Sequence, residues 1–432
     1  MIPLFETLRE YFLACADLFL ALPRHLWSFS RVSKRRTEFA NLSFSEKPTP
    51  ASNDPPQKPL RRIFISCGDA SGEAHTLRIL KELQNRNPEV TAVGFGSQKL
   101  KDAGLDCWEP LADLNVMGFR DVAAQLPLFF RCVYRFAKEL HQNPPDVVLL
   151  VDYPGLNRHL LRIAKRANVP VVDFVAPQLW GWAPWRIEDF KKADRLLTIL
   201  PFEEDWYRKR GAKPVYIGHP LGDSMESPSV EEIPVPNEIL EHSDWVGLLP
   251  GSRRREIRQN LPLLLEAAEL LQKENPKTRF VLPLNRDSAW EVADSLLSSS
   301  SVQILPAPGS FYSVLPHLKA AWVASGTASL EVAARGVPTV VVYRVESRLG
   351  DWMARHALAV PHIGSLNLIA GRKLVPEHLG RNLSPQALAQ DLAYFLTPSG
   401  LNSFTESLAP LLPFFAQPGV AARVVRNLEE IS

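Results

Sequence analysis

The sequence has few cysteines and no marked excess of either charge. Its 432 residues include four cysteines, Cys15, Cys67, Cys107 and Cys132, which lie far apart and form no C-x-x-C pair. This spacing argues against a zinc site and against a disulfide framework, and it is typical of a reducing compartment. The formal net charge is only +2, so the chain as a whole gives no reason to expect a nucleic-acid partner.

Two common nucleotide-binding motifs are also missing. The chain has no Walker-type G-x-x-x-x-G-K-[ST], and its second half has no G-x-G-x-x-G. These absences argue against a P-loop ATPase and against a dehydrogenase. What is present is a composition of 46% hydrophobic and 22% charged residues, which is typical of a globular enzyme with a sizeable core. At this length we expect two domains or more.

The first sixty residues form a distinct segment. Residues 2–22 carry an apolar stripe at helical spacing, with acidic residues mostly off the stripe. These charges argue against a membrane-spanning helix, and no A-x-A-like cleavage site is evident. A basic cluster at 31–36 and a proline-rich stretch at 48–59 follow. The stripe consists of Phe5, Leu8, Phe12, Cys15, Phe19 and Leu22.

Three interpretations of this segment remain open. It is an interfacial helix with cations at an anionic membrane surface, an accessory helix packed on the enzyme body, or an organelle transit peptide. The acidic residues weaken the third interpretation. Because proline-rich segments are extended spacers, we expect residues 48–59 to separate this helix from the domains.

From residue 61 onward, apolar runs alternate with helical patterns. Such alternation indicates parallel sheets covered by helices on both faces. We therefore predict an α/β protein with two Rossmann-like domains facing across a cleft, at 61–225 and 240–384, after the N-terminal segment 1–60. We expect helices of 385–432 to pack back on the first domain. The predicted strands are 63–66, 91–94, 146–151, 169–174 and 195–200 in the first domain and 245–249, 279–284, 302–305, 320–324 and 339–344 in the second.

A strand–turn–helix pattern lies at residues 320–331. An apolar run is followed by Ser325, Gly326 and Thr327, which open a helix with Thr327 or Ser325 as the expected N-cap. The unpaired N–H groups and partial positive charge of a helix N-terminus suit an anion such as a diphosphate. Glu331, one turn further on, is placed to accept hydrogen bonds from a ribose. Taken alone, the pattern also fits an ordinary βαβ turn.

A second turn of the same kind precedes the first by about 75 residues. The apolar run 246–250 is followed by Gly251, Ser252 and Arg253. Glycine lets a backbone approach a ligand closely, and an arginine offers planar donors suited to phosphate. Both turns would lie at carboxyl ends of strands in one sheet, beside one crevice. With the missing motifs above, this pair of turns favours a nucleotide-sugar site.

Nine short motifs occur in the order expected of the lipid-A-disaccharide synthase family, which the chain resembles over about residues 61–430. The first sixty residues have no counterpart in this resemblance. The family has the GT-B architecture, in agreement with the two predicted domains. The motifs are CGDASGE at 67–73, NVMG at 115–118, VDYPGLN at 151–157, VAPQLWGW at 175–182, LPFE at 200–203, IGH at 217–219, LPGSR at 249–253, ASGTASLE at 324–331 and NLIAGR at 367–372.

The resemblance implies an inverting, metal-independent glycosyltransferase without a cofactor. The donor would be UDP-2,3-diacylglucosamine and the acceptor 2,3-diacylglucosamine 1-phosphate (lipid X). The products would be the β-1,6-linked lipid A disaccharide 1-phosphate and UDP. The chain has no D-x-D pair, so no obvious metal motif contradicts this. Helix N-termini and basic side chains would then stabilise the leaving diphosphate, and the turns at Gly251 and Gly326, with Arg253 and Arg344, suit that task.

The resemblance also suggests roles for acidic residues in the first domain. Asp152 follows an apolar strand and matches the family's favoured general base, which would take the proton of the acceptor's 6-hydroxyl; the alternative is a structural cap. Asp69 is expected to line the acceptor side. Two features depart from the family pattern. Gly155 stands where the family has its second aspartate. The acids of the first turn are Asp69 and then Glu73, whereas the family more often has glutamate first and aspartate last.

Further candidates for substrate binding come from the remaining motifs. His219 would contact the sugar or diphosphate, or else order the hinge. Tyr343 would stack on uracil, or else belong to the core at a strand end. Asn157 keeps its family position, while Asn367 and Arg372 match a family loop in which Ser365-Leu366 replaces the usual Leu-Pro.

The expected partners are the two lipid substrates and a membrane surface, with no nucleic acid; a homodimer is left open. We expect a cytoplasmic enzyme peripherally associated with the inner membrane of a Gram-negative-type bacterium. Two alternatives compete. One is another GT-B enzyme acting on a UDP-sugar. The other is a catalytically inactive relative that binds lipid, which Gly155 and the exchanged acids would favour.

Overall fold

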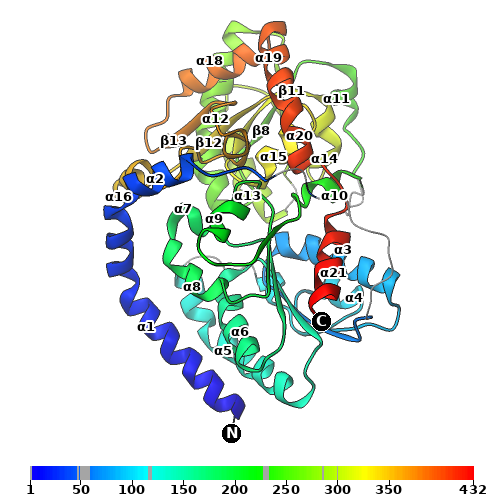
Figure 1. Ribbon diagram of the computed structural model, residues 1–432. Helices are drawn as coiled ribbons and strands as arrows, with labels where there is room; N and C mark the ends of the chain where they lie inside the picture. Colours follow the sequence, from blue (N-terminus) through cyan, green and yellow to red (C-terminus); the bar gives the residue numbers. More distant parts are fainter. Residues whose placement is uncertain are drawn as a thin grey trace. The chain divides into compact units, whose positions relative to one another are not determined.

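The computed structural model describes residues 2–45, 48, 59–114, 119–226, 233–284, 287–298 and 300–432. The chain divides into two compact units (Figure 1). Unit 1 comprises Met1–Glu226 and Gln417–Ser432, and unit 2 comprises Ser227–Ala416. Each unit is built on one parallel sheet with helices on its faces, which confirms the prediction of two Rossmann-like domains.

Unit 1 contains a seven-stranded parallel sheet in the order β3-β2-β1-β4-β5-β6-β7. Its central strands are apolar runs buried on both faces, as parallel sheets covered by helices require; every residue of Val147–Val151 is buried. The strands are β1 (Arg62–Cys67), β2 (Thr91–Phe95), β3 (Leu105–Glu109), β4 (Val147–Val151), β5 (Val171–Phe174), β6 (Arg195–Thr198) and β7 (Pro214–Tyr216).

The longer helices of unit 1 pack on this sheet or on other helices of the unit. They are α1 (Ile2–Ser30), α2 (Val32–Ala40), α3 (Ala70–Arg86), α5 (Phe119–Gln142), α6 (Pro154–Arg166) and α21 (Val420–Ile431). The shorter helical turns are α4 (Gln98–Asp102), η1 (Leu111–Leu114), α7 (Leu179–Trp182), η2 (Pro184–Arg186), α8 (Ile187–Phe190), α9 (Glu203–Arg208) and α10 (Leu221–Glu226).

Unit 2 contains a six-stranded parallel sheet in the order β10-β9-β8-β11-β12-β13. Its strands are β8 (Trp245–Leu249), β9 (Arg279–Leu282), β10 (Ile304–Pro306), β11 (Leu318–Ala324), β12 (Thr339–Arg344) and β13 (Glu377–Gly380). Its helices are α11 (Asn237–Glu241), α12 (Arg254–Glu274), α13 (Asp287–Leu297), α14 (Phe311–Val314), η3 (Leu315–His317), α15 (Thr327–Ala334), α16 (Arg348–His356), α17 (Ser365–Ala370), α18 (Pro385–Phe395), α19 (Pro398–Leu408), η4 (Ala409–Leu411) and α20 (Leu412–Phe415).

The N-terminal segment is part of unit 1. Helix α1 packs along α5 and α6, where His159 contacts the buried carboxylate of Glu10 at 2.9 Å. Further along, the ring of Phe39 contacts Phe202, and the Ser43 N–H donates to Asp205. The expectation that this helix is separated from the domains is therefore wrong, and the interpretation of a helix packed on the enzyme body is confirmed. Residues 49–58 of the proline-rich stretch lie outside the described residues. Complementary charges on α1 and α6 hold the two together.

The helices after Pro385 are divided between the units. Helix α18 packs along α12, and the Nε1–H of Trp322 donates to the Leu388 carbonyl at 3.0 Å, so α18 belongs to unit 2 with α19 and α20. Helix α21 belongs to unit 1, where Asp223 accepts hydrogen bonds from the first N–H groups of α21. The stretch Pro398–Ile431 is long and apolar enough to cross a membrane by length and composition, but residues 416–419 interrupt its helix.

Candidate active site

Two carboxylates meet at the carboxyl edge of the unit 1 sheet. Strands β1 and β4 are neighbours, with Cys67 opposite Val151. Asp69 follows the first strand by two residues and Asp152 follows the second directly, and their side chains share a hydrogen bond. Gly68 leaves room for the ring of Tyr153, because a Cβ at position 68 would lie 2.3 Å from that ring. A hydrogen bond between two carboxyl groups requires a proton between them.

The turn that carries Asp152 is held in an unfavourable backbone conformation. Asp152 and Tyr153 have φ angles of 49° and 51°, and Val175, after the neighbouring strand β5, has a φ of 62°. Left-handed backbone is costly for residues with a Cβ, above all for a β-branched one. Three such residues at the ends of two adjacent strands indicate a site whose geometry is imposed by its surroundings.

Asn157 imposes part of that geometry. Its side chain is fully buried in the first turn of α6. The Ser66 hydroxyl donates to its Oδ1 at 2.7 Å, and its Nδ2 donates to the carbonyls of Val151 and Asp152. These bonds engage both ends of the amide. Asn157 therefore supports the Asp152 turn, and its amide is already engaged by protein groups.

The surroundings of Asp152 favour a protonated carboxyl more than water does. Loss of solvent and the neighbouring carboxylate of Asp69 raise the pKa of Asp152 to about 7, against a smaller opposing effect of the Tyr153 N–H. Asp173, buried in β5, has its pKa raised well above its ordinary value by burial and by Asp152. A carboxyl with a pKa near 7 is suited to general base catalysis at neutral pH.

His219 lies three residues after the end of β7 and is buried. Its Nδ1 accepts a hydrogen bond from the Leu221 N–H at 3.2 Å, and burial lowers the pKa of the ring to about 4. Loss of solvent, and then the charge of His219, lower the pKa of the neighbouring His75 to about 3. Both imidazoles are therefore neutral at physiological pH, and the contact of Nδ1 with the backbone orders the chain that follows β7.

The candidate residues of unit 2 also gather at one sheet edge. Strand β11 lies between β8 and β12, with Val323 opposite Leu249 and Ala324 opposite Val342. The turns that follow β8 and β11 and the end of β12 are therefore neighbours. The residues at this edge are Gly251, Ser252, Arg253, Ser325, Gly326, Thr327, Tyr343 and Arg344.

The first of these turns is already capped by the protein. Gly251 has a φ of 112°, and a Cβ there would lie 2.4 Å from the carboxylate of Glu256. That carboxylate accepts hydrogen bonds from the N–H groups of Ser252 and Arg253 at 3.0 and 3.2 Å, and it pairs with the Arg253 guanidinium at 2.6 Å. A diphosphate bound here would compete with Glu256 for the same donors.

The second turn differs in detail from the expectation. Gly326 is the N-cap of α15, with no side-chain cap, whereas Thr327 is the first helical residue; the prediction of Thr327 or Ser325 as N-cap is wrong. The Ser325 hydroxyl donates instead to the Ile363 carbonyl at 3.3 Å. Burial raises the pKa of Glu331, against a hydrogen bond with Tyr312 and the charge of Arg335.

Four further candidates occupy different settings in unit 2. Tyr343 is 48% exposed, which excludes its alternative interpretation as a core residue. Arg344 donates to the Gln259 carbonyl at 2.9 Å, and Arg372 is exposed. Asn367 is fully buried. Its Oδ1 accepts from the N–H groups of Leu374 and Val375, and its Nδ2 donates to the Val375 carbonyl and to the Glu377 carboxylate. Asn367 thus holds its loop together in the same way as Asn157 holds the Asp152 turn.

Two buried acids of unit 1 were not among the predicted site residues, although Glu203 belongs to the LPFE motif. Asp173 interrupts an otherwise apolar strand, a signal that the sequence does contain. Glu203 accepts from Trp180 Nε1 at 3.0 Å and from two backbone N–H groups, and burial raises its pKa to about 7.

Within the described residues, no three His, Cys, Asp or Glu side chains gather in a way that could hold a metal ion. The NVMG motif at 115–118 lies outside the described residues.

Comparison with known proteins decides the family. The family model of lipid-A-disaccharide synthetase matches residues 63–403. The chain belongs to this family. It is 34% identical over 381 residues to the lipid-A-disaccharide synthase of Myxococcus xanthus, covering 86% of this chain and 97% of that protein. It is 33% identical over 366 residues to the enzyme of Syntrophus aciditrophicus, covering 84% and 95%.

Membership in the lipid-A-disaccharide synthase family makes this chain a hexosyltransferase of lipid A biosynthesis. Among solved structures, it is similar to the UDP-GlcNAc 2-epimerase of Neisseria meningitidis, with a TM-score of 0.56 and 14% identity over 85% of this chain and 99% of that one. At this identity the likeness concerns the fold alone. The predicted GT-B fold is confirmed, and the region that the family model matches begins after α1 and α2.

Proposed function

We propose that this enzyme joins two diacylated glucosamine units, taking one from UDP-2,3-diacylglucosamine and adding it to 2,3-diacylglucosamine 1-phosphate. The products are the β-1,6-linked disaccharide 1-phosphate and UDP. The observation that carries this proposal in the structure is the Asp69–Asp152 pair at the carboxyl edge of unit 1, with a pKa near 7 at Asp152. Such a group removes a proton from a hydroxyl at neutral pH.

The reaction we propose is a single displacement with inversion. Asp152 takes the proton of the acceptor's 6-hydroxyl as that oxygen forms a bond to the anomeric carbon of the donor. The bond between the anomeric carbon and the phosphate oxygen breaks, and its electron pair leaves with UDP. In the protonated state the Asp152 carboxyl donates a hydrogen bond to the Asp69 carboxylate, which orients it, and loss of that proton makes Asp152 the acceptor for the 6-hydroxyl proton.

The carboxyl edge of unit 2 is the proposed site of the leaving diphosphate. The N-termini of α12 and α15 and the guanidinium groups of Arg253 and Arg344 supply positive charge at this edge. Since Glu256 caps α12, we expect its carboxylate to release the N–H groups of Ser252 and Arg253 when the nucleotide binds. Tyr343, exposed at the end of β12, is the proposed stacking partner of uracil, and Glu331 the proposed acceptor for the ribose.

Replacement of Arg253 by alanine tests this placement. We expect Arg253→Ala to weaken UDP binding by about 10- to 100-fold, or about 1.5–3 kcal/mol, because a charge-assisted contact with the diphosphate is lost. Arg254→Ala is the matched control, since Arg254 is equally exposed but pairs with Glu291. Calorimetry with UDP measures both. Equal affinities of the two variants would place the diphosphate away from the α12 N-terminus.

The pH dependence of turnover tests the carboxylate pair. Only the ionised form of Asp152 accepts a proton, so turnover should rise with pH through about 7 and level off above it. Asp69→Asn removes the neighbouring negative charge, which lowers the pKa of Asp152 and moves the rise to lower pH. The asparagine still accepts the Gly72 N–H, so the cap of α3 is kept. A pH profile that does not move in this variant contradicts the proposed coupling.

We further propose a cytoplasmic enzyme bound peripherally to the inner membrane of a Gram-negative-type bacterium, with a homodimer as one assembly to test. Both proposed substrates carry acyl chains, which supports a membrane location.

An assay of UDP release from UDP-diacylglucosamine with lipid X distinguishes the proposed function from its two alternatives. Another UDP-sugar enzyme releases no UDP with lipid X as acceptor, and an inactive relative releases none with any acceptor.

A further inference from the structure

Helix α1 turns its charged face toward unit 1. Glu10 is fully buried, and its carboxylate contacts His159 at 2.9 Å, Arg166 at 2.7 Å and Arg162 at 3.3 Å. Glu6 pairs with Arg166, and Asp17 with Arg158 and Arg24. Burial acts to raise the pKa of Glu10, but its hydrogen bonds and the nearby cations outweigh burial and lower that pKa. A row of cations on α6 thus holds the acidic face of α1.

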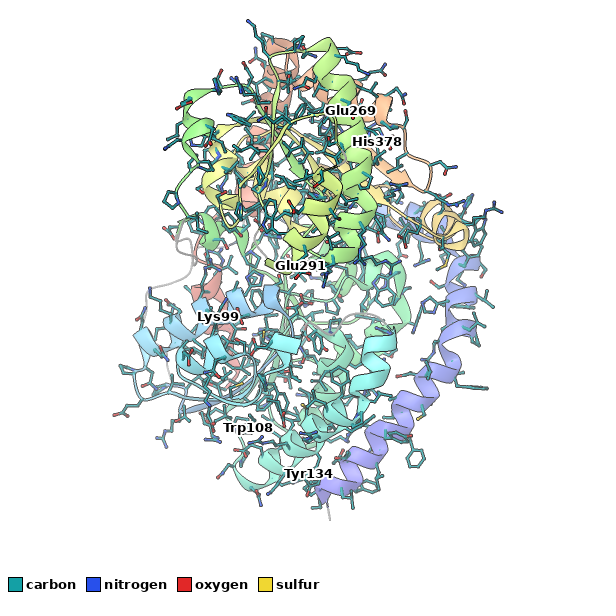
Figure 2. The ribbon with its side chains drawn as sticks, turned by 180° about the vertical axis from the view of Figure 1, so that it is seen from behind. Lys99, Trp108, Tyr134, Glu269, Glu291 and His378 are labelled. Carbon is teal, nitrogen blue, oxygen red and sulfur yellow. The ribbon has the colours of Figure 1, made fainter. Side chains whose placement is uncertain are left out.

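The opposite face of α1 is apolar and exposed. Phe12 is 69% exposed and Phe19 is 83% exposed. Side chains project from α1 along the side that faces away from the rest of unit 1 (Figure 2). This is the reverse of the usual arrangement, in which a surface helix buries its apolar stripe. The large exposed residues are Ile2, Leu4, Phe5, Leu8, Tyr11, Phe12, Leu18, Phe19, Leu20, Leu22, Leu26 and Trp27.

The shape and charge of this face fit a lipid surface. At 3.6 residues per turn, the exposed apolar positions cover about half of the helix circumference, whereas a helix packed on one partner helix uses a narrow seam. The three acids of α1 all lie on the buried face, and the outer side carries Arg9, with Arg31 and Lys34 just beyond the helix. The Arg31 guanidinium stacks on Trp27 at 4.1 Å. A broad apolar face bordered by cations and an aromatic residue is typical of a helix at an anionic membrane.

The same helix contacts both elements that frame the Asp152 turn. The ring of Tyr11 packs on Phe130 of α5 at 5.1 Å, and the adjacent Phe129 packs on Tyr153 at 6.1 Å. Helix α6, which carries the four basic partners of α1, begins at Pro154, two residues after Asp152. The position of α1 and the position of the catalytic turn are therefore fixed by the same two helices.

We infer that α1 is a membrane-docking helix, clamped to α6 by ion pairs so that its apolar face enters an anionic lipid surface and the Asp152 turn is presented to acyl-chain substrates in that surface. This inference rests on the proposed function, because it assigns a role to α1 in reaching the lipid acceptor. The occupant of the apolar face is the membrane. A second copy of this chain is the competing occupant, and the experiments below separate the two.

Cys15 provides a reporter at the centre of the apolar face. It is exposed, whereas Cys67 and Cys132 are buried. In a Cys107→Ser background, the full chain can be labelled at Cys15 with an environment-sensitive dye. We expect its emission to shift to shorter wavelength on vesicles of phosphatidylglycerol and phosphatidylcholine, with a weaker shift on phosphatidylcholine alone. An emission already shifted without vesicles, together with a dimer in light scattering, would assign the face to a second copy and overturn the inference.

Substitution of the apolar face tests its contribution to catalysis. The triple variant Phe5→Ser, Phe12→Ser, Phe19→Ser leaves the ion pairs with α6 intact. We expect at least tenfold weaker sedimentation with anionic vesicles and a matching loss of turnover on vesicle-embedded substrates. The matched control is Leu240→Ser, Tyr394→Ser, Leu401→Ser, three exposed apolar residues of unit 2, which should change neither. Unchanged vesicle binding in the α1 variant overturns the inference.

A second variant tests the clamp itself. Glu10→Gln removes the buried negative charge that faces three basic partners, and we expect α1 to detach while its apolar face still binds lipid. Vesicle binding should then persist, but turnover on vesicle-embedded substrates should fall about tenfold. Full vesicle turnover in this variant would show that α1 does not position the turn and would overturn that part of the inference.

Turnover in detergent micelles separates these results from failure of the proposed function. Micelles deliver lipid without a planar surface, so the triple serine variant and Glu10→Gln should both retain it there. Loss of micelle turnover in Glu10→Gln would mean that the clamp maintains the active fold rather than the orientation at a membrane, which also contradicts the inference. Absence of micelle turnover in the unchanged chain would instead contradict the proposed function.

Discussion

Asp152→Asn should lower turnover by about 10²- to 10⁴-fold while leaving UDP affinity unchanged. The amide has nearly the same shape as the carboxyl but cannot accept the proton of the acceptor hydroxyl, so the loss should fall on kcat rather than on donor binding. The expected magnitude is that of a missing general base. Steady-state assays with both lipid substrates, and calorimetry with UDP, measure the two quantities.

Asp173→Asn is the matched control for this experiment. Asp173 lies buried in the adjacent strand and its pKa is also raised, but the residue sits within β5 rather than at the open end of β4. Its substitution should have a much smaller effect on kcat. Turnover of Asp152→Asn near that of the unchanged enzyme, or a larger loss in Asp173→Asn, would remove Asp152 from the role of base.

The second large effect is expected for Asn157→Ala. Alanine leaves the Ser66 hydroxyl and the carbonyls of Val151 and Asp152 without their partner in a buried site. Lost hydrogen bonds and unsatisfied buried groups should lower the free energy of unfolding by about 2–4 kcal/mol. Because the left-handed turn at Asp152 and Tyr153 is then less restrained, we also expect kcat to fall by about 10- to 100-fold.

Two readouts distinguish positioning from a general loss of stability in this variant. As the Asp152 carboxyl moves away from Asp69, the pH at which turnover rises should shift downward, whereas loss of folded protein alone lowers turnover equally at every pH. Asn427→Ala is the control, since Asn427 is also buried in unit 1 and donates to the Arg423 carbonyl of its own helix. It should leave kcat and the pH profile unchanged. The same profile for both variants would argue against a positioning role.

The central strands of both sheets were predictable because burial on two faces demands continuous apolar runs. The strands predicted at 63–66, 146–151, 245–249 and 320–324 correspond to β1, β4, β8 and β11. Three strands were missed: β3, β7 and β13, each at the edge of its sheet. An edge strand has one neighbour and more solvent, so it tolerates polar residues such as Asp106 and Glu377 and loses the apolar signal.

The location of the candidate sites followed from the same patterns. Polar and glycine residues directly after apolar runs mark the carboxyl edge of a parallel sheet, which places Asp69 beside Asp152 and Gly251 beside Gly326. The hydrogen-bond partners of these residues could not be predicted from the sequence. That Glu256 caps the turn after β8, and that the amides of Asn157 and Asn367 are directed inward, depends on atoms brought together only by folding.

Helix α1 shows most clearly what the sequence determined and what the tertiary structure decided. The 3.6-residue period of its apolar and acidic residues specified an amphipathic helix with two separate faces. Which face is buried depends on the surface that receives the helix. Arg158, Arg162 and Arg166 recur every fourth residue on α6, so they form one row opposite Glu6, Glu10 and Asp17. Because mutual neutralisation is the condition for burying charge, the acidic face turned inward and the apolar face remained outside.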